Sequence, residues 1–345
     1  GAILGLAPYM PSASHALAWG VTGAGVLQLV WLYGVCGRQG VWLKLSRPRF
    51  DPDVLDLMKR MIPVAVGAGI YQINLVIDTI IASLLPTGSI SYLFYADRVN
   101  QLPLGILGVA VGTALLPMLS RQVRSGDTVA ALRSQNLAIE ISLLLTIPAA
   151  VALVVIADPV IRVLFERGAF GTAETEATAA ALSVYATGLP AYVLVKALAP
   201  GFFGRKDTAT PVKISVLCLV TNLALNLILM GPYGHVGIAA ATVVSSWLNA
   251  GFLAYVLYRR GHLVIDSRLS RRLPGMIAAS VGMGLALNFA FGLLAHDLVG
   301  STEERVLALV ILVLGGMVVY GLLALVLRVV QFEDIKSLYQ GGGRI

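Results

Sequence analysis

Long apolar runs dominate the sequence, and they decide what the chain can fold into. Several reach 18 residues or more without a charged side chain, such as the run from Val306 to Leu327. A helix of about 20 apolar residues crosses a hydrocarbon core about 30 Å thick. Only 12% of the residues are charged, against about 25% in a typical soluble domain. Because lipid offers no partner to free backbone groups, we predict an all-α polytopic membrane protein.

About nine full spanning segments are predicted, with short connections and no inserted soluble domain. They cover residues 15–36, 61–85, 89–119, 137–157, 175–203, 212–230, 236–258, 273–295 and 306–328, each to within a few residues. The opening residues GAILGLAPYM read as the last turns of a further spanning helix. We therefore expect this sequence to be part of a longer protein.

Lys and Arg residues gather in alternate connections between the predicted spans. They concentrate at 37–60, 120–136, 204–213 and 259–272 and in the tail, whereas the opposite connections hold mainly acidic residues. Basic connections stay in the cytoplasm, so the pattern predicts a cytoplasmic C-terminus. The net charge of +7 then belongs to one membrane face, and we expect no nucleic-acid partner.

Five ionisable residues fall inside predicted spans: Asp78, Asp97, Arg98, Glu140 and Lys196. A charge in the bilayer costs about 2.5–3.5 kcal/mol on insertion scales, so each of them is a functional candidate. Glu140 lies near the cytoplasmic end of its span, where we expect it to reach water. Lys196 has three interpretations: pairing with Asp78 or Asp97, contact with an anionic substrate, or extension to the membrane surface.

Arg98 has two interpretations that the sequence alone leaves open. It follows Ser89 by nine residues, about 13 Å along a helix, which places it near the middle of the membrane. Alternatively, Tyr92, Phe94 and Tyr95 form an outer aromatic belt and Arg98 extends to the surface beside Asp97. If buried, its planar guanidinium would suit a phosphate, because it donates two parallel hydrogen bonds.

Asp78 and three uncharged polar residues are candidates for a cation site. Asn222 and Asn226 are four residues apart and share a helix face, and Thr242 lies at a similar depth in the next predicted span. Together these oxygens would suit Na⁺, or Asp78 would bind a proton. The alternative is that the asparagines bridge helices as structural hydrogen bonds.

Signals for enzymatic chemistry are weak. The four histidines are far apart, the two cysteines suggest neither a disulfide nor a metal site, and no phosphate loop or nucleophile elbow is present. We therefore expect no catalytic and no metal-ligating residues. A glycosyltransferase acting on lipid-linked sugars remains an alternative, but the close acidic pairs at 174–176 and 303–304 fit solvated helix starts.

Three segments resemble a known family. They are YADRVNQLPLGILGVAVGTALLPMLSR at 95–121, LVKALAPGFFGRKDTATPVK at 194–213 and LFERGAF at 164–170. They are similar to segments of the MurJ/MviN family of bacterial lipid II flippases, within the multidrug/oligosaccharidyl-lipid/polysaccharide exporter superfamily. The resemblance implies two six-helix lobes and an extra helix pair. On that template, residues 1–50 are a remnant of the first lobe, 51–260 the second lobe, and 261–345 the extra pair and tail.

The resemblance also implies a function and a site. The chain is expected to take part in moving undecaprenyl-linked lipid II across the bacterial cytoplasmic membrane by alternating access, without covalent chemistry. Arg98 would face a central cavity and bind pyrophosphate, with Asp97 beside it; we expect Asn100, Gln101 and Lys196 to join them. The extra helices would carry the prenyl chain. Na⁺ or H⁺ is the expected coupling ion, and membrane lipids and lipid II are the expected partners of a full-length monomer. The alternative is a cation-coupled exporter of drugs or another polysaccharide lipid.

Overall fold

The computed structural model describes residues 5, 9–40, 51–295, 298 and 300–330. Residues 41–50 of the predicted basic connection at 37–60, and the predicted cytoplasmic tail from 331 onward, lie outside these residues. Two compact units divide the chain, residues 1–59 and residues 60–345. In the first unit, α2 covers Ala13–Arg38, and Ser12 caps its first turn. Helix α3, Pro52–Ala82, begins in the first unit and continues in the second.

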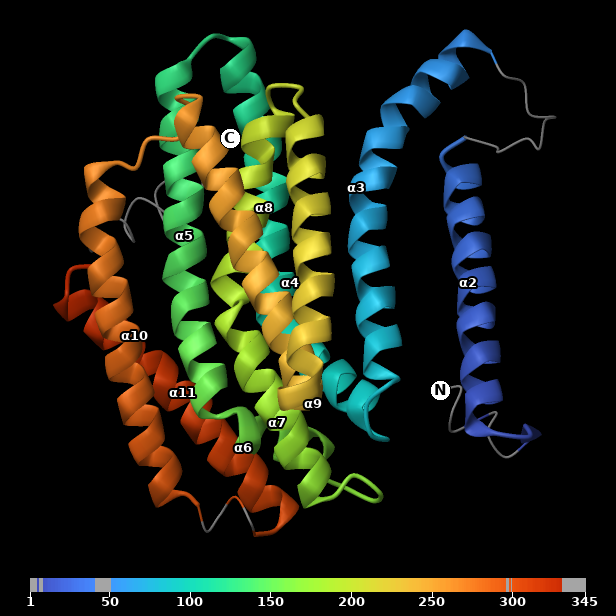
Figure 1. Cartoon of the computed structure of the whole chain (residues 1–345), viewed down its shortest axis with the longest axis vertical. Helices are drawn as coiled ribbons and strands as arrows, with labels where there is room; N and C mark the ends of the chain where they lie inside the picture. The colour runs from blue at the N-terminus through green and yellow to red at the C-terminus, as the bar shows by residue number, and fades with distance from the viewer. Residues whose placement is uncertain (1–4, 6–8, 41–50, 296–297, 299, 331–345) are drawn as a thin grey trace. The chain divides into compact units, whose positions relative to one another are not determined.

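The second unit is a helical bundle (Figure 1). Its further helices are α4 (Ser89–Arg124), α5 (Thr128–Val155), α6 (Ala157–Phe165), α7 (Thr172–Thr187), α8 (Leu189–Phe203), α9 (Ala209–Arg259), α10 (Ser267–Leu293) and α11 (Thr302–Val326). The predicted all-α membrane fold is confirmed by the helical structure of the described residues. Six helices in the described part are long and apolar enough to cross a membrane. The count of nine crossings stays a prediction.

Polar side chains cap helices at the ends of apolar segments. The Asp127 carboxylate accepts a hydrogen bond from the Ala130 amide at 2.9 Å, and Asp266 accepts one from Leu269 at 2.7 Å. Ser301 and Glu304 cap α11 reciprocally. These side chains satisfy backbone donors that the first turn of a helix leaves without partners. The sequence therefore marks these three helix starts directly.

Helical geometry is broken at two glycines, one inside a predicted span and one between two predicted spans. The span at 175–203 is divided at Gly188 into α7 and α8. The two spans at 212–230 and 236–258 form the single element α9, whose helical geometry is interrupted at Gly234 (φ 55°, ψ −134°) just after Pro232. Asn222 and Thr242 are in hydrogen-bond contact across this break; twenty residues of straight helix would separate them by about 30 Å. The chain thus folds back at Gly234, and Figure 1 shows the halves of α9 as neighbouring helices.

Helix α8 packs against α4, α5 and α9, and α7 packs against α4, α5 and α9 as well. Small residues on these helices are fully buried, including Ala181, Ala191 and Ala197. Without a hydrophobic driving force between helices in lipid, such residues stabilise a bundle by allowing close backbone approach. Many large apolar side chains on the outside remain exposed, as a lipid-facing surface requires.

Helices α10 and α11 pack on each other and on the α5–α6 side of the bundle (Figure 1). Glu140 of α5 holds the predicted cytoplasmic end: its Oε1 lies 2.6 Å from Arg272 Nη1, and its Oε2 lies 3.0 Å from Arg268 Nε. The expectation that Glu140 reaches water is wrong, because the residue is only 5% exposed. Two arginines from a helix 128 or more residues later satisfy its charge instead.

The predicted outer end of α11 is also held by an ion pair. Arg305 Nη1 lies 3.1 Å from Glu166 Oε1, and Arg162 Nη1 lies 3.0 Å from Glu166 Oε2. Between the two ends, the Tyr320 hydroxyl donates to the Leu144 carbonyl oxygen at 2.8 Å. The helix pair is therefore attached to the bundle at both ends and in the middle.

Candidate transport cavity

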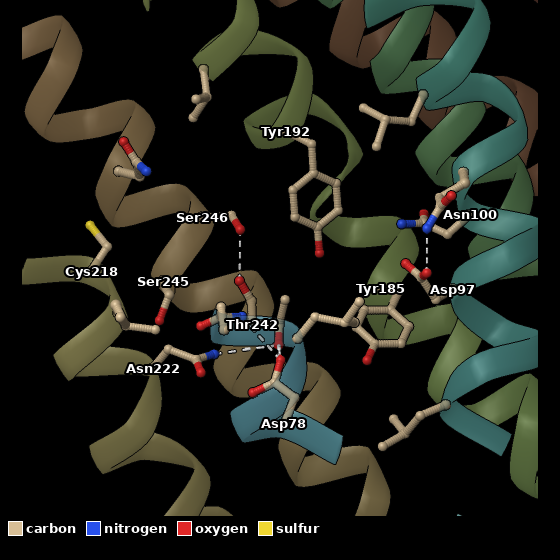
Figure 2. A pocket seen from close by; sticks show the side chains of 18 of the residues that line it. Asp78, Asp97, Asn100, Tyr185, Tyr192, Cys218, Asn222, Thr242, Ser245 and Ser246 are labelled. Carbon is tan, nitrogen blue, oxygen red and sulfur yellow. Dashed lines mark hydrogen bonds between the residues drawn. The ribbon is translucent and has the colours of Figure 1, made fainter. Parts of the chain in front are cut away.

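A cavity of about 680 Å³ lies in the second unit among α3, α4, α7, α8 and α9. Its size is within the range of about 300–1,000 Å³ typical of small-ligand sites. Figure 2 shows Asp78, Asn222 and Thr242 converging at one end, with Asp97 and Asn100 on the opposite wall. The cavity thus combines apolar walls with two separate polar groups.

Asp78, on the last turn but one of α3, is the centre of the first polar group. Its Oδ1 accepts a hydrogen bond from Asn226 Nδ2 at 2.6 Å. Its Oδ2 accepts from Thr242 Oγ1 at 3.2 Å and from Asn74 Nδ2 at 3.1 Å. The amide of Asn226 also reaches Asn222 Oδ1 at 2.9 Å. The four predicted cation-site residues therefore meet, although they are up to 164 positions apart in the sequence.

The asparagine amides around Asp78 have oxygen atoms that could serve as cation ligands. With its amide turned, Asn222 would donate to Asp78 Oδ1 at 3.0 Å and to Asn74 Oδ1 at 3.1 Å. Asn226 is fully buried, and its Oδ1 has no hydrogen-bond partner in the described part of the chain. Turning the Asn226 amide would bring its oxygen, in place of Nδ2, toward the Asp78 carboxylate. A carboxylate, amide oxygens and a hydroxyl form the type of ligand set that hard cations prefer.

Asp97, Asn100 and Gln101 all line the opposite wall of the cavity from α4. The Asp97 carboxylate accepts a hydrogen bond from the Gln101 amide, one helical turn later. Asn100 is only 2% exposed, and its Oδ1 has no partner among the described residues. Three of the predicted substrate residues therefore share one face of one helix.

Arg98 lies outside the residues that line the cavity. Its guanidinium is 4.7 Å from the centre of the Phe94 ring, and the residue is exposed. Phe94 itself lines the cavity, so Arg98 is next to the lining rather than part of it. Tyr95 contacts Phe165 and Phe170, with ring centres 4.7 and 5.4 Å apart. Arg98 is thus one turn beyond Tyr95, whose ring packs on Phe165 and Phe170, and its role in binding pyrophosphate stays a prediction.

Lys196 lines the cavity from α8, and its side chain is exposed. In the described part of the chain, no ion pair joins it to Asp78 or Asp97. Of the nine predicted site residues, the cavity is lined by all except Arg98 and Asn226, and Asn226 lies directly behind Asp78. The structure therefore places the candidate cation-binding residues and the candidate substrate-binding residues around the same cavity.

Sequence reasoning missed polar residues on the second half of α9. Ser245, Ser246 and Asn249 line the cavity together with Thr242. Their spacing of three and four residues places them on one helix face, and this spacing could have identified them. Asn74, four residues before Asp78, carries the same signal. Within the described residues, no group of three or more His, Cys, Asp or Glu side chains is arranged to hold a metal ion.

Comparison with known proteins identifies the family. The family model described as lipid II flippase MurJ matches residues 1–308. The chain belongs to the lipid II flippase MurJ family. A probable lipid II flippase MurJ from Rhizobium tropici is 44% identical over 328 residues, covering 93% of this chain and 60% of the relative. A MurJ protein from Vibrio cholerae is 36% identical, covering 96% of this chain and 63% of the relative.

Solved structures agree with this membership. A lipid II flippase MurJ in an inward closed conformation matches with a TM-score of 0.65 and 26% identity, over 82% of this chain and 57% of that one. A MATE transporter in the bent conformation matches at a TM-score of 0.52 and 19% identity, over 76% of this chain and 62% of that one; that likeness concerns the fold alone. MurJ is a family of transporters rather than enzymes, and the chain is a multi-pass protein of the bacterial inner membrane. It spans about 60% of the length of the curated relatives.

Proposed function

We propose that this chain supplies the second six-helix bundle and the following helix pair of a lipid II flippase. Residues 51–260 would form the bundle and 261–345 the pair with a cytoplasmic tail, while residues 1–50 would belong to the first lobe. The observation that carries the proposal is the family match over residues 1–308. In the full-length protein, a lipid-linked peptidoglycan precursor would move from the cytoplasmic to the outer leaflet by alternating access.

The cavity supports a division of roles within this function. Asp97, Asn100, Gln101 and Lys196 line its walls and would contact the substrate headgroup. Arg98 is exposed beside the lining residue Phe94. There its guanidinium is available to two phosphate oxygens at once. Undecaprenyl-linked lipid II would be the substrate, with surrounding membrane lipids as the other partners of a monomer.

The Asp78 group supports coupling to a cation. Asp78, Asn222, Asn226 and Thr242 are joined by hydrogen bonds, and the described residues include no Lys or Arg bonded to Asp78. A half-buried carboxylate without a basic partner carries a desolvation cost, and binding Na⁺ or H⁺ would remove that cost. Cation binding would therefore stabilise one arrangement of α3 and the two halves of α9, which gives the transport cycle a source of energy.

The direct test measures lipid II exposure on the outer face of cells that depend on the full-length protein for flipping. Arg98→Ala is expected to reduce lipid II exposure strongly, because the phosphate loses a charged, bidentate hydrogen-bond donor. Arg124→Ala, at the other end of α4, is the matched control and should behave as wild type. Failure of the wild-type protein to expose lipid II would contradict the proposed function. Wild-type exposure by Arg98→Ala at normal protein levels would contradict the role of Arg98.

A further inference from the structure

Pro148 interrupts the backbone hydrogen bonds of α5. It lies inside this helix and is buried. Proline has no N–H, so it cannot donate to the carbonyl four residues earlier, and its ring clashes with that carbonyl. The carbonyl in question belongs to Leu144. Because α5 is one of the helices long and apolar enough to cross a membrane, the surrounding lipid offers no donor in place of the missing one.

Tyr320 of α11 supplies the missing donor. Its hydroxyl donates to the Leu144 carbonyl oxygen at 2.8 Å, from 176 positions later in the sequence. The side chain is half-buried, and its ring packs against both of the larger buried apolar clusters. Membrane helices tolerate proline where a neighbouring helix satisfies the carbonyl that the proline frees. The contact therefore completes the hydrogen bonding of α5.

Two hydroxyl side chains weaken the same stretch of α5. Ser142 Oγ donates to the Ala138 carbonyl oxygen at 2.6 Å, and Thr146 Oγ1 donates to the Ser142 carbonyl oxygen at 2.6 Å. Hydroxyls bonded to the carbonyl four residues earlier slightly destabilise a helix and often bend it, and proline bends it further. Residues 138–148 thus combine three bending features in about three turns. The bend there would vary unless a neighbouring helix fixed it.

The bend in α5 matters for the cavity. Helix α5 packs against α4, α7 and α8 as well as against α10, and α4, α7 and α8 all contribute lining residues. The α10–α11 pair is attached at its two ends by the ion pairs of Glu140 with Arg272 and of Glu166 with Arg305. A change in the bend of α5 would therefore move cavity-lining helices relative to this pair.

We propose that Tyr320 is a positioning residue for transport, whose hydroxyl replaces the amide that Pro148 lacks and thereby fixes the bend of α5. Helices α5, α10 and α11 then form one rigid frame, against which the cavity helices move. This inference rests on the proposed function, because a rigid frame serves transport only if the rest of the bundle changes its arrangement. It assigns Tyr320 no contact with the substrate.

The test measures the bend of α5 in the full-length protein in lipid nanodiscs. Spin labels at Val129 and Val154, both exposed on α5, lie on either side of Pro148 and about 38 Å apart along a straight helix. Double electron–electron resonance in a cysteine-free background gives their distance distribution. Tyr320→Phe keeps the ring and removes the donor. Tyr258→Phe makes the same change at a side chain of α9 that is 63% exposed, and is the matched control.

Tyr320→Phe should raise the population outside the wild-type distance peak about fivefold, the effect of one net hydrogen bond. It should also slow lipid II translocation in proteoliposomes, whereas Tyr258→Phe should match wild type in both measurements. Pro148→Ala restores an amide donor to the Leu144 carbonyl. In that background, Tyr320→Phe should therefore have no further effect on the distance distribution or on translocation.

Three results would overturn the inference. An unchanged distance distribution in Tyr320→Phe would mean that the hydroxyl does not fix the bend, and this comparison decides even if Pro148→Ala does not fold. Equal broadening with and without Pro148→Ala would mean that Tyr320 acts through packing rather than through the freed carbonyl. Wild-type translocation despite a changed distribution would mean that the bend does not serve transport. A wild-type protein that does not translocate lipid II would contradict the proposed function instead, and the distances would still judge the role of Tyr320.

Discussion

Two carboxylates on opposite sides of the bundle, Glu140 buried and Asp78 half-buried, show how differently the same chemical group is used. Glu140, between α5 and α10, has two arginines within 3.0 Å. Asp78, at the cavity, has two amides and a hydroxyl as bonding partners. A carboxylate paired with arginine holds helices together and has little to gain from another cation. A carboxylate surrounded by neutral dipoles retains its affinity for a cation.

The same contrast separates the two sides of the second unit. The α5–α10–α11 side is joined by ion pairs at both ends, and its glycines fit closely against neighbours; a Cβ on Gly284 would lie 2.7 Å from Val151 Cγ1. The cavity side between α3, α4 and α9 has open volume and polar atoms without partners. Close packing favours one arrangement, whereas a hydrated, loosely filled side allows more than one. We therefore expect motion during transport on the cavity side.

The largest expected effect is on stability, for Glu140→Ala. This change removes the carboxylate from Arg268 and Arg272, and breaking a buried ion pair from one side costs about 3–5 kcal/mol. Chemical denaturation of the purified full-length protein would measure the loss. Glu140→Leu combined with Arg272→Met is the control and should recover most of it, because the two buried partners are then replaced by apolar groups and Arg268, 46% exposed, can be solvated. A loss below about 1 kcal/mol would show that the pair does not hold α10.

Asp78→Asn should preserve stability and reduce the response of transport to cations, the opposite of Glu140→Ala. The protein should be at least as stable as wild type, because a half-buried charge without a basic partner is removed. The response of transport to Na⁺ or pH should fall by about 5- to 150-fold, the usual range of coupling between sites. Lipid II translocation in proteoliposomes at varied Na⁺ and pH would measure it. An unchanged cation and pH response would rule out coupling through Asp78.

Thr242→Val makes a smaller change at the same site than Asp78→Asn. It keeps the side-chain shape and removes one hydrogen bond to Asp78, worth about 1 kcal/mol net. We expect the cation concentration for half-maximal transport to rise about fivefold, with the maximal rate preserved. Thr221→Val is a suitable control, because Thr221 lies on the same helix and bonds only its own backbone at Leu217. Equal shifts in both variants would show a general helix effect instead of a ligand effect.

The smallest expected effect is at the connection between α8 and α9. Burial by itself would raise the pKa of Asp207, but hydrogen bonds from Arg260 and Thr210 outweigh it and lower the pKa to about 2. Since this folded-state pKa is below the unfolded value, the pair stabilises the protein fully above about pH 4 and the contribution is lost as pH falls through about 2. Arg260 is 43% exposed, so Asp207→Asn should cost only about 0.2–1 kcal/mol at neutral pH. A loss that persists unchanged at pH 2 would contradict this origin.

Much of the fold could be predicted from local sequence patterns, because spanning segments, helix breaks and caps depend on neighbouring residues. The apolar runs predicted a helical membrane protein, and the break between α7 and α8 lies at Gly188 and Pro190 of the GLP sequence, where a helix breaker stands inside an apolar run. The polar residues inside apolar runs also identified Asp78, Asn222, Asn226 and Thr242 as candidates. For Glu140 the same reasoning was wrong, since its depth in one helix says nothing about which other helix covers it.

The class of fold, the lipid-facing composition and the short list of polar residues that are costly to place in a membrane can therefore be read from the sequence. Which of these residues meet depends on the tertiary structure. Asp78 and Asn226 are 148 positions apart, and Glu140 and Arg272 are 132 apart. Such pairs depend on the packing of whole helices against one another, which no local periodicity encodes; only the reversal at Gly234 falls in a connection that the sequence predicted, between the spans 212–230 and 236–258. The physical difference between a structural and a coupling carboxylate lies in those distant partners.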